Sequence, residues 1–240
     1  MFVTINDQSI FYQRNTYEEK PIILLHGWEC NGYTMRCIFN FFTGYRRSVF
    51  ALDLCGFGRS EKPKKPMTIY DYADIVEKFI KRFCHTKPDI IAHSFGGRIA
   101  LILASKNLVN KMIITGGAGL KPRFSLVKFV RKIKYKLSKK LGKSTDKSGS
   151  ADYKKTSGMM RATFVSVVNT HLDGLLDKIE TPTLLIWGRN DNQTPLYMAR
   201  IMNKKVKNSR LIVLNNSGHF AFLDEPTLFL GASKRFLLKE

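Results

Sequence analysis

The feature that most constrains the fold is a series of short, continuous apolar runs. They lack the alternation of apolar and polar residues that is typical of a strand with one solvent-exposed face. Six such runs follow one another along the chain, at residues 22–25, 49–52, 90–92, 112–114, 183–187 and 211–214. Runs of this length are typical of strands covered on both faces, as in a parallel sheet. Residues 2–5 and 10–13, separated by four polar residues, predict an antiparallel pair of strands before them.

Helical patterns occupy the intervals between these runs. Apolar residues recur at spacings of three and one over residues 70–83, which predicts a helix with one apolar face. Further helices are predicted at 98–106, 197–202 and 226–238. Strands that alternate with helices indicate an α/β protein with a doubly wound, mostly parallel sheet, in which ligands bind beyond the carboxyl ends of the strands. The length of 240 residues suits one large domain.

Composition excludes several other classes of protein. A hydrophobic fraction of 44% and an aromatic fraction of 12% exclude a chain that is disordered throughout. No apolar run approaches the length of a membrane span, and the N-terminal residues lack the pattern of a signal peptide, so we expect a soluble, cytoplasmic protein. The four cysteines show neither CxxC spacing nor a histidine cluster, which predicts free thiols and no metal site.

The apolar run at 90–92 leads directly into His93-Ser94-Phe95-Gly96-Gly97, and a helical pattern follows. A strand, a sharp turn and a helix in this order form a nucleophile elbow, which presents a serine hydroxyl at a helix N-terminus above the sheet edge. The turn needs small residues two positions before and after the serine, and Ala92 and Gly96 occupy them. Ser94 is therefore the candidate nucleophile, although a turn of this composition also arises by chance.

A serine nucleophile needs a base, and the base needs an acid that orients it. Of the five histidines, His219 is the candidate base, because it lies in the loop Asn215 to Phe220 that follows the predicted buried strand at 211–214. Asp191 follows the preceding strand, and Thr194-Pro195 opens the next helix. The chain order Ser94, Asp191, His219, each beyond the carboxyl end of a separate strand, predicts a catalytic triad. The competing interpretations are a loop histidine without a catalytic role and, for Asp191, a helix N-cap.

Acyl transfer to a serine also needs hydrogen-bond donors for the oxyanion. His26-Gly27-Trp28 follows the strand at 22–25, so its turn can present the Trp28 backbone N–H beside that of Phe95. Two such groups would form an oxyanion hole, in which the loss of one donor costs about 3 kcal/mol. We expect His26 itself to be a buried residue that shapes the turn.

Taken together, these motifs resemble the α/β-hydrolase superfamily, serine-nucleophile branch. The matching segments span nearly the whole chain in family order: His26-Gly27-Trp28, Asp53 to Ser60, Ala92 to Gly97, Gly188 to Pro195 and Ser217 to Phe220. The resemblance implies an α/β-hydrolase fold and excludes the members that use an aspartate nucleophile, such as dehalogenases and epoxide hydrolases. Two positions depart from the family pattern, Ala92 where glycine is usual and Cys55 where proline or arginine is common, and neither removes a catalytic atom.

The positive charge of the chain is concentrated in one segment. The net charge is +21, and residues 121–155 alone hold 13 basic and two acidic residues. The resemblance implies a helical lid inserted after the sixth strand, here residues 121–170, with residues 1–120 and 171–240 as the core domain. Within it, apolar residues at spacings of three and four predict a basic amphipathic helix: Leu126, Val130, Ile133, Leu137 and Leu141. Its lysines are either solvated or face an anionic membrane surface or an anionic substrate.

The sequence thus predicts a serine hydrolase that cleaves carboxylic esters of small to medium acyl groups through an acyl-enzyme, without a cofactor. The residues expected to line its substrate site are Trp28, Phe95, Met159, Phe164 and Phe220, with core packing as the alternative for the lid residues. Two alternatives are a carbon-carbon bond hydrolase of dienoate type and a ligand-binding signalling module with slow turnover. The charge alone would also suit nucleic acid, but no binding fold supports a specific complex. The sequence indicates no oligomeric state.

Overall fold

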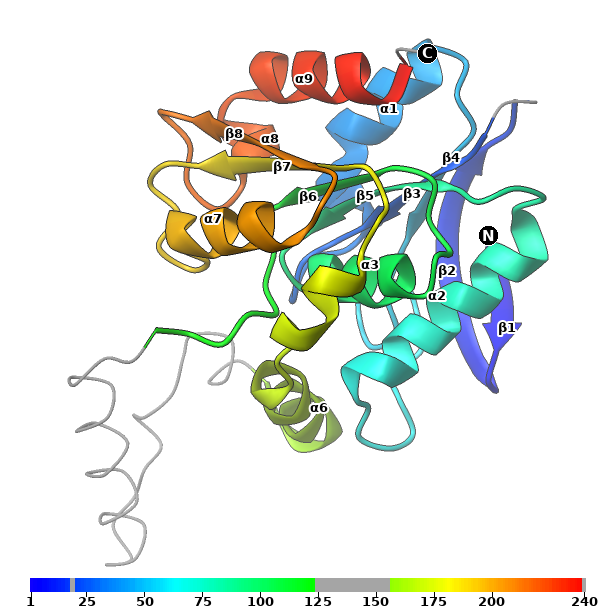
Figure 1. The fold of residues 1–240 in the computed structure, drawn as a ribbon. Helices are drawn as coiled ribbons and strands as arrows, with labels where there is room; N and C mark the ends of the chain where they lie inside the picture. The colour runs from blue at the N-terminus through cyan, green and yellow to red at the C-terminus, as the bar shows by residue number, and fades with distance from the viewer. Residues whose placement is uncertain (18–19, 124–155, 239–240) are drawn as a thin grey trace, which may run out of the picture.

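The computed structural model describes residues 1–17, 20–123 and 156–238. These residues form an eight-stranded sheet with helices on both faces (Figure 1). The strands are ordered β1-β2-β4-β3-β5-β6-β7-β8 across the sheet. Strand β2 is antiparallel to both of its neighbours, β1 and β4, and every other pair is parallel. The predicted α/β fold with a mostly parallel, doubly wound sheet is confirmed.

Each predicted apolar run is a strand, with ends that differ from the prediction by at most two residues. The strands are Phe2–Ile5 (β1), Gln8–Asn15 (β2), Ile22–Leu25 (β3), Val49–Leu52 (β4), Asp89–His93 (β5), Met112–Thr115 (β6), Thr183–Gly188 (β7) and Ser209–Leu214 (β8). Strands β3 to β7 are buried along their whole length, as continuous apolar runs predict. The β1–β2 hairpin turns at Asn6 and Asp7, which both have positive φ, as a two-residue type I′ turn requires.

The helices within the described residues are Arg36–Gly44 (α1), Ile69–Phe83 (α2), Phe95–Ser105 (α3), Gly158–Asn169 (α6), Leu196–Lys205 (α7), Ala221–Asp224 (α8) and Pro226–Leu238 (α9), with 3-10 helices at Gly32–Met35 (η1) and Asp173–Lys178 (η2). The four helices predicted from the sequence are α2, α3, α7 and α9. Helix α2 begins where the Thr68 hydroxyl accepts the Asp71 N–H and the Asp71 carboxylate accepts the Thr68 N–H, a capping box. Helices α1 and α8 were not predicted.

Two hydrophobic clusters hold the helices against the sheet. On one face, α1, α8 and α9 bury large side chains such as Phe42, Phe222 and Phe229 against alternate residues of the central strands. On the other face, α2, α3 and α7 bury theirs, including Phe79 and Met202. Figure 1 shows both layers, with α9 and α1 on one side of the sheet and α2, α3 and α7 on the other.

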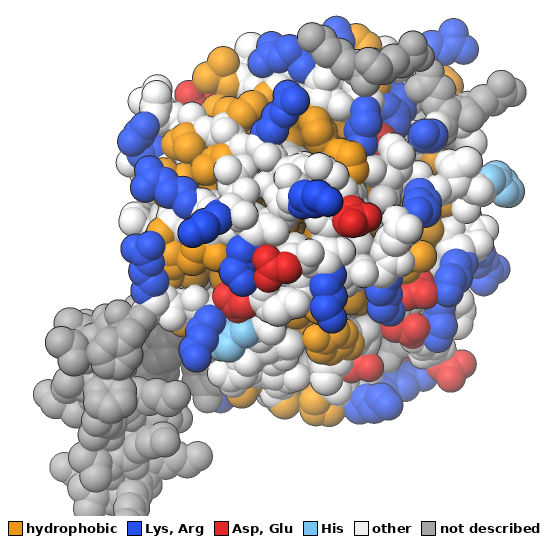
Figure 2. All heavy atoms as spheres, in the orientation of Figure 1, with side chains coloured by type: hydrophobic (Ala, Val, Ile, Leu, Met, Phe, Trp, Pro, Cys, Tyr) orange, Lys and Arg blue, Asp and Glu red, His pale blue; other side chains and the backbone are white. Residues whose placement is uncertain are grey.

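The chain between β6 and β7 is the long connection in which the lid was predicted. Its described part contains α6, which lies beyond α3 in Figure 1, and η2. The predicted basic helix around residues 126–141 lies outside the described residues, so the lid boundaries at 121 and 170 stay a prediction. Figure 2 shows Lys and Arg side chains of the described chain spread over the face in view rather than gathered in one patch. None of the helices in the described ranges is both long and apolar enough to cross a bilayer.

Candidate active site

Ser94 occupies the sharp turn between β5 and α3 that the sequence predicted. Its backbone has φ 49° and ψ −106°, a conformation that a non-glycine residue adopts only when its surroundings impose it. The turn packs so closely on β3 that a Cβ at Gly96 would lie 2.3 Å from the Leu25 carbonyl oxygen, so glycine is required there. Ala92, in contrast, pairs with Leu25 inside the sheet and its methyl group is buried in the core. The departure from glycine at this position is therefore accommodated.

Asp191 and His219 form a buried pair beyond the ends of β7 and β8. His219 Nδ1 donates to Asp191 Oδ2 over 2.9 Å, and both residues are less than 10% exposed. Burial by itself would raise the pKa of the Asp191 carboxyl, but the hydrogen bond and charge of His219 and the donors of Thr194 outweigh it and hold the pKa below its usual value. Asp191 is thus ionised at neutral pH and keeps the His219 proton on Nδ1, which leaves Nε2 to act as a base.

Thr194 completes the hydrogen bonds around this carboxylate. Its amide donates to Asp191 Oδ1 at 2.9 Å, and its hydroxyl lies 2.8 Å from Asp191 Oδ2, 2.9 Å from the Gly116 carbonyl oxygen and 3.3 Å from His219 Nδ1. With one proton, the hydroxyl donates to one of these oxygens at a time and can accept from His219. Thr194 therefore holds both members of the pair.

The loops that carry Asp191 and His219 meet through their backbones. The Asn190 amide donates to the Ser217 carbonyl oxygen at 2.9 Å, and the Arg189 amide donates to that of Leu214 at 2.8 Å. The contact is so close that a Cβ at Gly188 would lie 2.0 Å from the Gly218 carbonyl oxygen. A side chain at Gly188 would separate the two loops and, with them, Asp191 from His219.

The two N–H groups predicted for an oxyanion hole lie in neighbouring turns. The Gly96 amide donates to the His26 carbonyl oxygen at 3.0 Å, which ties the turn after β3 to the start of α3. Within the described residues, neither the Trp28 nor the Phe95 amide has a hydrogen-bond partner. Phe95 is the first residue of α3, where an unpaired N–H and the helix dipole favour negative charge.

His26 and His93 are buried beside this site as neutral rings. His26 Nε2 accepts the Leu54 amide at 2.9 Å, so its proton lies on Nδ1, which donates to the Gly27 carbonyl oxygen at 2.7 Å. Burial lowers the pKa of His26 to about 4, as expected for a residue that shapes a turn. Burial and the neighbouring His219 ring lower the pKa of His93 to about 3. His93 Nε2 lies 3.1 Å from the His219 carbonyl oxygen and so supports the backbone of the candidate base.

A cavity of about 620 Å³ opens beside Ser94. Its walls are largely apolar and come from the turn after β3, from α3 and from α6: Trp28, Phe95, Ala118, Phe164, Val167 and Val168, with Ser94, Arg98, Gln193 and Thr194 as its polar members. The Trp28 ring packs edge-on against Phe95 and Phe164, at centroid distances of 5.2 and 5.1 Å. Three of the five residues predicted to line the substrate site are thus brought together.

The other two predicted substrate residues lie elsewhere. Met159 is 46% exposed and lines a separate cavity, with Gly56 and Met160, that does not include Ser94. Phe220 packs on the rings of His93 and His219 from behind the site. Met159 does not line the Ser94 cavity because it lies on another face of α6. Phe164, Val167 and Val168 share the face that lines the cavity, and a residue five positions before Phe164 projects in a different direction.

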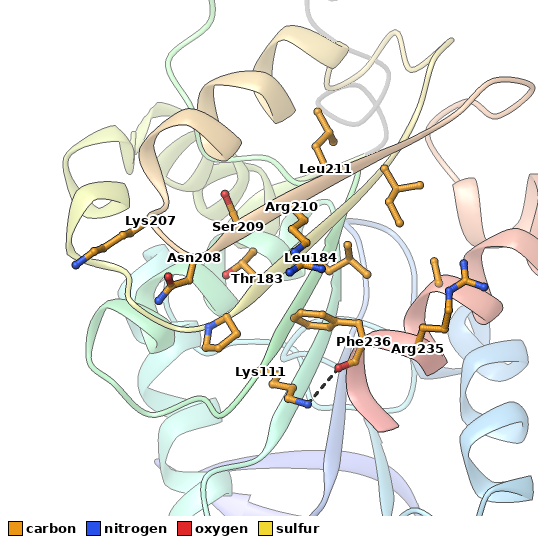
Figure 3. A pocket seen from close by; sticks show the side chains of 13 residues that line it. Lys111, Thr183, Leu184, Lys207, Asn208, Ser209, Arg210, Leu211, Arg235 and Phe236 are labelled. Carbon is orange, nitrogen blue, oxygen red and sulfur yellow. Dashed lines mark hydrogen bonds between the residues drawn. The ribbon is translucent and has the colours of Figure 1, made fainter. Parts of the chain in front are cut away.

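A larger cavity, of about 820 Å³, lies at the opposite end of the strands. Figure 3 shows it between the starts of β7 and β8 and helix α9, where Lys111 Nζ donates to the Phe236 carbonyl oxygen at 3.1 Å. It is far from the carboxyl ends of the strands, where ligands bind in open α/β sheets, and it contains none of the predicted site residues.

Sequence reasoning missed two functional candidates, Thr194 as a hydrogen-bond partner and Arg98 as a wall of the cavity. A signal for each was present. Arg98 is the only charged residue in the segment 90–105, and Thr194 stands three positions after Asp191, a spacing at which a carboxylate accepts backbone and hydroxyl donors.

Comparison with known proteins identifies the family and the fold of the chain. The family model of the alpha/beta hydrolase fold matches residues 20–164 and 143–226, and the chain belongs to this family. A pimeloyl-[acyl-carrier protein] methyl ester esterase of Neisseria meningitidis is 26% identical, over 91% of this chain and 77% of the relative. The family and its esterase and hydrolase members support a hydrolase enzyme.

Solved structures share the fold over the whole length. An esterase from Exiguobacterium antarcticum, EaEST, superposes with a TM-score of 0.80 at 21% identity, covering 99% of both chains. A meta-cleavage product hydrolase from Pseudomonas fluorescens, CumD, superposes with a TM-score of 0.77 at 18% identity, covering 99% of this chain and 97% of that one. Likeness at this level of identity concerns the fold.

Proposed function

We propose that this chain is a serine hydrolase that cleaves carboxylic esters of small to medium acyl groups, with Ser94, His219 and Asp191 as its catalytic triad. The observation that carries the proposal is a common location: the strained Ser94 turn, the Asp191–His219 hydrogen bond of 2.9 Å and two amides without a partner among the described residues all lie beyond the carboxyl ends of parallel strands. Ser94 and Phe95 also line an apolar cavity there. The similarity to two esterases supports an ester as the substrate class.

The proposed reaction follows from these positions. Ser94 Oγ attacks the ester carbonyl carbon while His219 Nε2 takes the hydroxyl proton, and Asp191 stabilises the imidazolium through Nδ1–H. The Trp28 and Phe95 amides donate to the oxyanion of the tetrahedral intermediate. His219 then protonates the departing alcohol, and a water molecule deprotonated by His219 hydrolyses the acyl-Ser94 ester. Each proton taken by His219 is returned, so the cycle needs no further reactant.

The cavity supports the proposed range of acyl groups. Its volume of about 620 Å³ lies within the usual range for small-molecule sites, and six apolar side chains form most of its wall. Burial of acyl methylene groups against such a wall contributes about 0.8 kcal/mol each. We therefore expect kcat/KM to rise with acyl length until the cavity is filled.

A fluorophosphonate probe and a panel of p-nitrophenyl esters of increasing acyl length test the proposal. We expect stoichiometric labelling at Ser94 and ester turnover, both abolished in Ser94→Ala. The matched control is Ser105→Ala at the far end of α3, where the hydroxyl donates only to the Ile102 carbonyl oxygen, and which should retain both. Labelling that persists in Ser94→Ala would place the nucleophile elsewhere, and tight ligand binding without turnover would favour a signalling module.

A further inference from the structure

Arg98 is a buried cation in the wall of the Ser94 cavity. It is the fourth residue of α3, and Ser94 immediately precedes that helix. Arg98 is only 7% exposed, and it lines the same cavity as Ser94.

The hydrogen bonds of Arg98 leave part of its guanidinium group unused. Nη1 donates to the carbonyl oxygens of Val167 and Thr170, at 2.8 and 2.6 Å, at the end of helix α6. Within the described residues, Nε and Nη2 have no partner. A guanidinium carries five N–H donors in a rigid plane, so three of them remain available on the other edge of the fork.

Among the residues that the structure describes, no group compensates the charge of Arg98. No Asp or Glu of the described chain pairs with it, and burial alone lowers the pKa of its guanidinium to about 10, so the group is still a cation at neutral pH. Arg47, the other buried arginine among the described residues, shows the usual solution, since its Nη2 lies 2.8 Å from the Asp89 carboxylate. Buried charges are costly unless an opposite charge accompanies them.

The residues of the described chain that line the cavity offer no counter-charge. Its other polar members, Ser94, Gln193 and Thr194, are neutral, and the remaining side chains are apolar. A ligand carboxylate would supply the missing charge, and its two oxygens match the geometry of the free edge of a guanidinium. In such an apolar surrounding, a charge-assisted hydrogen bond is stronger than at the surface.

We propose that Arg98 binds a carboxylate of the substrate, and that the preferred esters of this enzyme carry such a group on the part of the molecule held in the Ser94 cavity. The inference rests on the proposed ester hydrolysis at the same site. Arg98 is here a specificity residue, and its two bonds to α6 hold the guanidinium in place for the ligand.

Two matched pairs of esters test the proposal. The p-nitrophenyl monoesters of glutarate and glutaramate place a carboxylate or an amide on the acyl side, and the butyrate esters of glycolate and glycolamide place it on the alcohol side. We expect kcat/KM to be at least about tenfold higher for the carboxylate member of one pair, and Arg98→Gln to remove this preference, a ten- to hundredfold effect for a charge-assisted bond. The preference is measured as the ratio of kcat/KM between the two members of a pair, because loss of the bonds to α6 affects both members alike.

Other outcomes separate the possible roles of Arg98. If Arg98→Gln lowers kcat/KM equally for both members of each ester pair, the guanidinium only anchors α6, and the proposal is overturned. A wild-type enzyme without preference in either pair overturns it as well. Arg98→Lys, which keeps the charge but loses the fork, should retain only part of the preference.

Calorimetric titration of the wild-type protein with glutaramate, which has one carboxylate, and with glutaramide, the neutral diamide, measures carboxylate binding without any turnover. We expect glutaramate to bind at least about tenfold more tightly than glutaramide, and equal affinities would refute the inference even if the Arg98 variants fail to fold. Absence of ester hydrolysis and of Ser94 labelling would instead refute the proposed function, so the two failures are distinguishable.

Discussion

The buried neutral histidines make the stability of this protein sensitive to mild acid. The pKa values of His26 and His93 are lowered to about 4 and about 3 in the folded chain. Both rings therefore stay neutral in the folded state at pH 5, whereas in the unfolded chain they take up protons near pH 6.5. Between pH 7 and pH 5 the unfolded state binds more protons, so the free energy of unfolding falls as the pH falls.

The size of this effect depends only weakly on the folded pKa values, because both lie below pH 5. Integration of proton uptake by a group with an unfolded pKa of 6.5 gives a loss of about 2 kcal/mol for each ring between pH 7 and pH 5. Together the two rings lower the free energy of unfolding by about 4 kcal/mol, a large part of the 5 to 15 kcal/mol typical of a domain.

Urea unfolding at pH 7 and pH 5, followed by circular dichroism at constant ionic strength, measures this loss. In His93→Gln, which keeps a donor for the His219 carbonyl oxygen but removes the titrating group, the loss between the two pH values should be smaller by about 2 kcal/mol. Exposed His85 provides the matched control, since His85→Gln should leave the pH dependence unchanged. If His93→Gln shows the same pH dependence as the wild type, the reasoning about this ring is refuted.

Three further perturbations probe the site, the turn and the lid. Asp191→Asn should lower kcat for ester hydrolysis by about 10⁴, because His219 would no longer be held in the correct tautomer and its imidazolium would lose its counter-charge. A decrease in kcat of only a fewfold would mean that another residue orients His219. Gly96→Ala should destabilise the fold by about 3 kcal/mol in thermal or urea unfolding, because its methyl group would meet the Leu25 carbonyl oxygen. The control is Gly231→Ala, which has open space around it and should not destabilise the fold. Equal effects of the two substitutions would contradict the packing argument. If the basic residues of the predicted lid helix face an anionic membrane surface or substrate, their replacement by glutamine should weaken binding to anionic vesicles or anionic acyl substrates and reduce its salt sensitivity, while hydrolysis of a short neutral ester stays within about twofold. Unchanged binding would mean that their charge is only solvated. The residues replaced are Lys128, Arg131, Lys132, Lys136, Lys139 and Lys140.

Local patterns were sufficient to predict the strands because a strand buried on both faces consists of a continuous run of apolar residues. The same holds for helix α2, whose apolar face and capping residue Thr68 both appear in the sequence. Helix α1 lacks such a start signal, since Met35 precedes it without a side-chain hydrogen bond to its first turn. Its position depends on packing against α8 and α9, which follow in the chain by nearly two hundred residues.

The candidate triad could be predicted because each of its residues directly follows a strand that the sequence reveals. The walls of the cavity could not be predicted in the same way. Met159 and Val167 lie in one apolar stretch, and only the packing of α6 on Trp28 and Arg98 decides which of them faces Ser94. An apolar stretch without a strong helical period contains no information about which face is covered.

By itself, the sequence determined the class of fold, the strand positions and the order in which Ser94, Asp191 and His219 follow their strands, because these depend on patterns among near neighbours in the chain. Only the tertiary structure decided which distant groups meet. The Arg98 guanidinium finds its carbonyl partners 69 and 72 positions away, and no carboxylate of the described chain reaches it. Contacts over such separations depend on how whole elements pack. The sequence therefore could not show that the buried Arg98 guanidinium has no carboxylate of the described chain beside it.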